Sequence, residues 1–147
     1  MKTRGFPTAI AFAFLWLGFV GAISFMEAWL KFKAPGLDLA TGLQIGRIVF
    51  KALNIVEWSI AIMIGVSLIR SGYLSKSVLF IFFTLIAVLL TQTFGLLPFL
   101  DERAMQFING EQPGSSNLHF YYVSLEILKV LGLIIFSIQI HRSNERS

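Results

Sequence analysis

The stretch "LHFYYVSLEILKVLGLIIFSIQI", residues 118–140, is the part of the sequence that decides the predicted fold. It is long and apolar enough to cross a lipid bilayer as a helix, which takes about 20 mostly apolar residues. Its first half nevertheless carries Glu126 and Lys129. A charged side chain that faces lipid near the bilayer centre costs at least about 2.5 kcal/mol on insertion scales. The stretch therefore predicts a transmembrane helix whose charged face contacts other helices.

Three other segments have similar length and apolar character. The four predicted spans are residues 7–32, 46–69, 77–97 and 118–140. They predict an all-α fold, an integral membrane four-helix bundle that forms a single domain over residues 1–147 and contacts membrane lipids. The composition supports this, because 56% of the residues are hydrophobic, more than a soluble domain of this size can bury. Pro98 is expected to end the third span, and "DERAMQFING" after it to form one or two amphipathic turns on the surface.

Basic residues are distributed unequally between the two predicted sides of the bundle. One side would hold Lys2, Arg4, Arg70, Lys76, Arg142 and Arg146. The other would hold Asp38, Asp101, Glu102 and Glu111, together with Lys33 and Arg103. The positive-inside rule then predicts a multi-pass protein of the cell inner membrane with both termini in the cytoplasm. The apolar run after Arg4 is longer than a signal-peptide core, so we expect the first span to be retained.

Polar residues within the spans share helix faces, since each residue of a helix turns by about 100°. Those of the fourth span, within roughly 80°, are His119, Tyr122, Glu126 and Lys129. Those of the second span are Arg47, Lys51 and Asn54, within roughly 60°, and Glu57, roughly 80° from Arg47. The first span adds Glu27 and Lys31, and the third adds Gln92. Because charges avoid lipid, we expect these faces to converge into one polar cluster that binds a ligand.

Depth below the periplasmic helix starts suggests which polar groups meet. A helix rises about 1.5 Å per residue, so the depth of each group follows from its position in the span. The predicted pairs are Glu57 with Lys129 at roughly 16 Å, Asn54 with Glu126 at roughly 12 Å, and Glu27 with Lys51 at roughly 8 Å.

The predicted cytoplasmic halves of the spans are almost free of polar residues, as in "AIMIGVSLI" and "VLGLIIFSI". A channel or proton wire needs polar groups or water across the whole membrane. The sequence instead predicts a polar pocket that opens to the periplasm above an apolar plug. Its basic residues suit an anion. We therefore expect the protein to bind, or help to move, a small polar or anionic ligand or a lipid headgroup.

Three stretches carry a family resemblance: "FVGAISFMEAWLKFKAP", "GLQIGRIVFKALNIVEW" and "NLHFYYVSLEILKVLGL". Their pattern resembles that of small bacterial four-helix membrane proteins known only as a domain of unknown function. These are distantly similar to the eukaryotic transmembrane protein associated with cisplatin resistance. The metal handling proposed for that relative relies on sulfur ligands, whereas this chain has no cysteine and only four methionines. The resemblance therefore implies a fold and little about activity.

Two other classes of function stay open at this level. The protein could be an accessory subunit of a larger membrane complex, or a homo-oligomer, with the polar residues serving only to hold helices together. It could also be a membrane enzyme that uses Glu57 or Glu126 as a general acid or base, although no motif supports this beyond the residue types.

No cofactor, metal ion or nucleic acid is expected. His119 and His141 lie at opposite predicted membrane faces, so they cannot both ligate one haem. The basic residues near His119 would repel a metal cation. The net charge of +4 is expected to set the topology rather than to bind nucleic acid.

Overall fold

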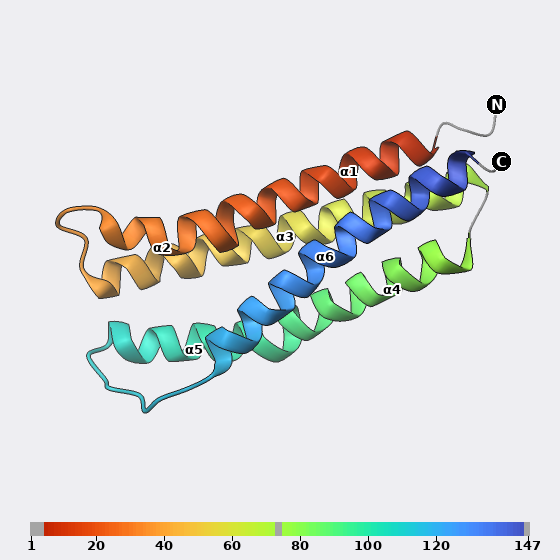
Figure 1. Cartoon of the computed structure of the whole chain (residues 1–147). Helices are drawn as coiled ribbons and strands as arrows, with labels where there is room; N and C mark the ends of the chain where they lie inside the picture. Colours follow the sequence, from red (N-terminus) through yellow and green to blue (C-terminus); the bar gives the residue numbers. More distant parts are fainter. Residues whose placement is uncertain (1–4, 73–74, 146–147) are drawn as a thin grey trace.

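The computed structural model of the protein describes residues 5–72 and 75–145, and every regular element in these ranges is helical (Figure 1). The elements are α1 (Gly5–Val20), η1 (Gly21–Glu27), α2 (Ala28–Leu30), η2 (Lys31–Lys33), α3 (Leu39–Ser71), α4 (Lys76–Leu90), η3 (Thr91–Leu96), α5 (Leu97–Ile108) and α6 (Leu118–Glu145). They join into four long helices, Pro7–Lys33, Leu39–Ser71, Lys76–Ile108 and Leu118–Ser143. Each is long and apolar enough to cross a membrane, which confirms the all-α prediction of four spans of this kind.

The second long helix begins earlier than predicted, at Leu39 instead of residue 46. Asp38 caps it, because the backbone N–H of Thr41 donates to Asp38 Oδ1 at 2.7 Å. The same hydrogen bond lowers the pKa of the Asp38 carboxyl. At the other end Gly72 adopts φ 67°, a left-handed conformation that favours glycine and closes the helix.

Pro98 does not end the third long helix, so that prediction was wrong. The chain changes from the α4 helix to a π-helical segment, η3, and continues as α5 to Ile108. Pro98 falls in the first turn of α5, a position where the missing N–H of proline is tolerated. The predicted turns of "DERAMQFING" are therefore helical, but they belong to a helix that packs against α3.

The apolar core occupies the half of the bundle that carries both ends of the described chain. Helix α1 packs against α3 and α6, and α4 packs against α6 (Figure 1). The buried core residues are Ala9, Ala13, Trp16, Val20, Ile60, Ala61, Ile64, Leu68, Val78, Leu85, Leu89, Leu133, Phe136 and Ile140. The bundle is therefore filled by side chains in the half that the sequence predicts to be apolar.

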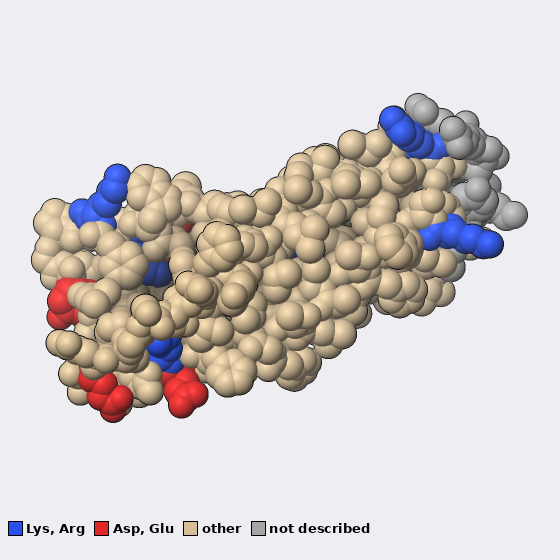
Figure 2. All heavy atoms as spheres, turned by 60° about the horizontal axis from the view of Figure 1, so that its bottom comes forward, with Lys and Arg blue, Asp and Glu red and all other residues tan. Residues whose placement is uncertain are grey.

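On the face drawn in Figure 2, a broad belt with almost no charged side chains lies between two charged ends. Exposed apolar side chains of the belt include Ile48, Ile55, Ile69, Phe80 and Phe94. The end with the chain termini carries exposed Arg70, Lys76 and Arg142. The opposite end has acidic and basic residues together (Figure 2). Lys2, Arg4 and Arg146, which also entered the predicted charge asymmetry, lie outside the described residues.

Replacement of Phe136 by alanine tests the core. Phe136 is fully buried and its ring lies 6.3 Å from that of Phe82, so we expect Phe136→Ala to lower the free energy of unfolding by about 3 kcal/mol. Phe80→Ala is the matched control, because Phe80 is 74% exposed and its loss should leave stability nearly unchanged. Unfolding in mixed detergent micelles measures both, and equal effects would contradict the packing.

Candidate functional site

The eleven predicted site residues do not form one cluster, as the sequence suggested, but two neighbouring groups. The residues that line an open pocket are Lys31, Arg47, Lys51, Asn54, His119 and Tyr122. The residues buried deeper in the bundle are Glu57, Gln92, Glu126 and Lys129. Glu27 pairs with Lys31 beside the pocket. The division arises because Asn54 and Tyr122, one helical turn above the buried group, already face the pocket.

Lys129 is the centre of the buried group. Its ammonium donates to Glu57 Oε1 and, at 2.9 Å, to Glu126 Oε1. Gln92 Nε2 donates to Glu126 Oε1 at 2.7 Å, and Trp16 Nε1 donates to Glu57 Oε1 at 2.8 Å. We call these five residues the buried cluster. Each is at most 1% exposed, and together they come from all four long helices.

The pairing of Glu57 with Lys129 confirms the prediction from matching depths. Glu126 lies one turn before Lys129 on α6, so the ammonium reaches both carboxylates. Removing charges from water is costly unless they are paired and hydrogen-bonded. These ionisable groups are therefore satisfied by one another and by polar side chains from the other long helices.

The other two predicted pairs are wrong. Asn54 Nδ2 donates to Thr93 Oγ1 at 2.9 Å rather than to Glu126. This happens because the π-helical segment η3 places Thr93 next to α3 at that level. The remaining predicted partners, Glu27 and Lys51, bind nearer groups: Glu27 pairs with Lys31 four residues later on its own helix at 3.3 Å, and Lys51 pairs with Asp101 at 3.2 Å.

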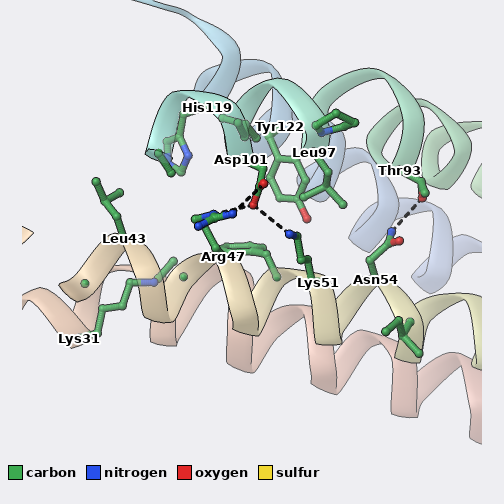
Figure 3. A pocket seen from close by; sticks show the side chains of 18 of the residues that line it. Lys31, Leu43, Arg47, Lys51, Asn54, Thr93, Leu97, Asp101, His119 and Tyr122 are labelled. Atoms are coloured by element: carbon green, nitrogen blue, oxygen red, sulfur yellow. Dashed lines mark hydrogen bonds and ion pairs between the residues drawn. The ribbon is translucent and has the colours of Figure 1, made fainter. Parts of the chain in front are cut away.

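The pocket is a cavity of about 610 Å³ between α2 and η2, α3, α5 and the start of α6 (Figure 3). This volume lies within the range of about 300–1,000 Å³ that is typical of small-molecule sites. Its charged lining consists of Lys31, Arg47, Lys51 and Asp101. Its apolar lining includes Phe32, Leu43, Phe50, Leu97, Leu100 and Ala104. A few charged groups in a mainly apolar wall suit an amphipathic ligand.

Arg47 and Asp101 form the strongest ion pair of the pocket. Arg47 Nε and Nη2 donate to the two carboxylate oxygens of Asp101 at 2.7 and 2.9 Å, a two-bond arrangement (Figure 3). Lys51 Nζ lies 3.2 Å from the same carboxylate, and its side chain is 61% exposed. The sequence placed Asp101 in a loop after Pro98 and missed it as a site residue. Pro98, three residues earlier, is compatible with a helix start, since proline is common in the first turn of a helix, but the sequence alone does not distinguish this from a helix end.

Two glycines of α3 allow the first long helix to present Lys31 to the pocket. A Cβ atom added at Gly46 would lie 2.9 Å from Lys31 Nζ, and one at Gly42 would collide with the ring of Phe32. The ammonium of Lys31 lies 5.4 Å from the ring centroid of Phe32 and 5.8 Å from that of Phe50. Lys31 is thus held over aromatic faces at the edge of the cavity.

Tyr122 connects the pocket with the buried cluster. It lines the cavity but is only 3% exposed, and its ring meets that of Phe50 edge to face at 5.5 Å. Its hydroxyl interacts electrostatically with the carboxyl groups of Glu126 and Glu57. Tyr122 therefore lies at the boundary between the pocket and the buried cluster.

Both π-helical segments lie beside this region. η3 supplies Gln92 to the buried cluster and Thr93 to the pocket, and η1 ends at Glu27. Thr93 also accepts from Trp58 Nε1 at 3.0 Å. Short π-helical stretches inside α-helices are frequent at functional sites, because the wider turn redirects neighbouring side chains. A hydropathy profile does not predict these π-helical segments, and it does not predict the hydrogen bond between Trp16 and Glu57.

The described residues contain no group of three His, Asp or Glu side chains that could hold a metal ion. His119 is exposed at the start of α6 and lines the pocket, but it does not belong to such a group. No family model, curated protein or solved structure matches the chain. The resemblance to small bacterial four-helix membrane proteins therefore stays a prediction.

Replacement of Lys129 by methionine tests the buried cluster. Lys129→Met leaves two carboxylates buried without their cation, so we expect it to lower the free energy of unfolding by about 3–5 kcal/mol. Lys76→Met removes the same charge from an exposed position and should change it by less than about 0.5 kcal/mol. Unfolding of both variants in mixed micelles measures the difference, and similar stabilities would show that the cluster does not form.

Proposed function

We propose that the protein is a multi-pass protein of the bacterial inner membrane that binds an anionic amphiphile, such as an acidic lipid headgroup, in the pocket between α3 and α5. The proposal rests on the cavity of about 610 Å³, which is lined by three cationic side chains, one carboxylate and apolar walls. Basic pockets between transmembrane helices suit anionic headgroups, while the apolar wall suits the start of an acyl chain.

The cationic groups retain donors for a ligand. Arg47 uses two N–H groups on Asp101 and one on the sulfur of Met105, and a guanidinium has five. Lys31 has a single long ion pair with Glu27 at 3.3 Å. Three cations against Asp101 leave an excess of positive charge in the lining, which Glu27 offsets only in part. An anion would therefore be attracted and find free hydrogen-bond donors.

The position of the pocket supports binding over conduction or acid–base catalysis. Among the described residues, the apolar core fills the bundle on the far side of the buried cluster, which argues against a polar path that continues from the pocket. Glu57 and Glu126 do not line the cavity, which separates the candidate acid and base from any ligand there. With both termini in the cytoplasm, as the basic residues Arg70, Lys76 and Arg142 favour, the pocket opens on the periplasmic side.

Short-chain lipids test the ligand class. We expect dihexanoyl-phosphatidylglycerol to bind the detergent-purified protein at least about tenfold more tightly than dihexanoyl-phosphatidylcholine, because only the former has a net negative charge. Arg47→Met should weaken the phosphatidylglycerol affinity about tenfold, since it removes a cation and leaves Asp101 paired with Lys51 alone. Isothermal titration calorimetry measures both effects.

The control is Lys33→Met, because Lys33 lies over the ring of Trp29 outside the pocket. Its phosphatidylglycerol affinity should equal that of the parent. Lys31→Met is a second pocket variant for the case in which Arg47→Met fails to fold. Inorganic phosphate in the same titration separates a free anion from a lipid. Equal affinities for the two lipids and for phosphate, or equal effects of the Lys31 and Lys33 variants, would contradict the proposal.

Cysteine labelling tests the topology, and the chain has no native cysteine to interfere. In intact cells stripped of the outer membrane, we expect a membrane-impermeant maleimide to label Glu111→Cys but to label Arg142→Cys only after lysis. Both positions are exposed in the structure, so a difference in labelling reports the side of the membrane. The reverse pattern would place the pocket in the cytoplasm.

A further inference from the structure

The charges of the buried cluster do not balance when both carboxyl groups are ionised. Glu57 and Glu126 contribute two negative charges and Lys129 one positive charge. Within the described chain, the ion pairs of these residues are only with one another. The neighbouring elements present uncharged groups, Trp16 from α1 and Gln92 from η3. A net charge in a site excluded from water is costly, and two carboxylates that share such a site retain a proton between them.

The hydrogen bonds show how the two carboxyl groups are satisfied. Glu57 Oε1 accepts from Trp16 Nε1 and Lys129 Nζ, and Glu126 Oε1 accepts from Gln92 Nε2 and Lys129 Nζ. Glu126 Oε2 is buried and has no hydrogen-bond partner, and neither has the side-chain oxygen of Gln92, which is bonded to the same carboxyl group through its nitrogen. Both unpartnered atoms are acceptors, and the hydroxyl of Tyr122 is a donor that faces Glu126. One proton held by the two carboxyl groups adds a further donor to the cluster.

We propose that the buried cluster is a proton-binding site, in which Glu57 and Glu126 share one exchangeable proton beside the ammonium of Lys129. The protonated cluster is electrically neutral. On the side of the apolar core it is closed by fully buried residues such as Leu133 and Phe136. On the other side Tyr122 lies between Glu126 and the pocket, and its hydroxyl can both donate and accept a hydrogen bond. The proton therefore exchanges with the pocket through Tyr122.

Infrared spectroscopy of the ligand-free protein tests this site without reference to the proposed lipid. The parent at neutral pH should show the carbonyl stretch of a protonated carboxylic acid. Glu126→Gln should abolish this band because Glu57 is then the only carboxyl group of the cluster and forms a balanced pair with Lys129. Glu57→Gln should abolish it too, because the remaining carboxylate then forms a balanced pair with Lys129. Each variant leaves one carboxylate and one ammonium, so both are expected to fold, which circular dichroism checks.

Glu27→Gln is the matched control, since Glu27 is a partly exposed carboxyl outside the cluster, and it should keep the band. In Tyr122→Phe the band should remain. The rate at which it shifts after transfer to deuterated water should fall at least about tenfold. The proton site would be overturned if the parent lacks the band or if Glu126→Gln retains it. It would also be overturned if added sodium ions remove the band, because a cation and not a proton would then occupy the site. An unchanged exchange rate in Tyr122→Phe would overturn the route through the pocket.

Discussion

The ammonium of Lys129 between two carboxylates constrains the whole bundle. It can be satisfied only if α3 and α6 turn Glu57 and Glu126 toward the same point, and only if α1 and η3 add Trp16 and Gln92 around them. A rotation of any one helix would leave a buried charge or donor without its partner, at a cost of several kcal/mol. The cluster thus fixes the rotation of each helix about its axis. Apolar surfaces alone would allow the helices to pack in several ways.

The cluster also separates two parts of the molecule with different character. On one side lies an apolar core that includes Ile64, Leu133 and Phe136. On the other, α5 leaves room beside α3 for a cavity with charged groups in an apolar wall (Figure 3). The change to π-helical geometry in η3 occurs at this level, and it lets one helix supply Gln92 to the cluster and Thr93 to the cavity. The proposed ligand and proton sites therefore share a boundary, Tyr122.

Hydropathy predicts the number and approximate extent of the long helices, because apolar segments of spanning length are unambiguous. Helical phase and depth also predict the pairing of Glu57 with Lys129, since both residues lie deep where few other polar groups compete. They fail nearer the helix ends. Lys51 and Arg47 form ion pairs with Asp101, which the sequence analysis placed in a loop after Pro98. A proline that starts a helix and one that ends it look alike without knowledge of the π-helical turn before it.

The sequence distance between the charged partners has a consequence for biogenesis. Glu57 and Lys129 are 72 residues apart. In the proposed topology the ribosome therefore delivers the second helix to the translocon long before the cation that neutralises it has been synthesised. Until then, Glu57 on the second helix must be either protonated or hydrogen-bonded to Trp16, whose indole is already present on the first helix. Assembly is then completed by the last helix, so a nascent chain cut short before Lys129 would be a natural substrate for membrane quality control.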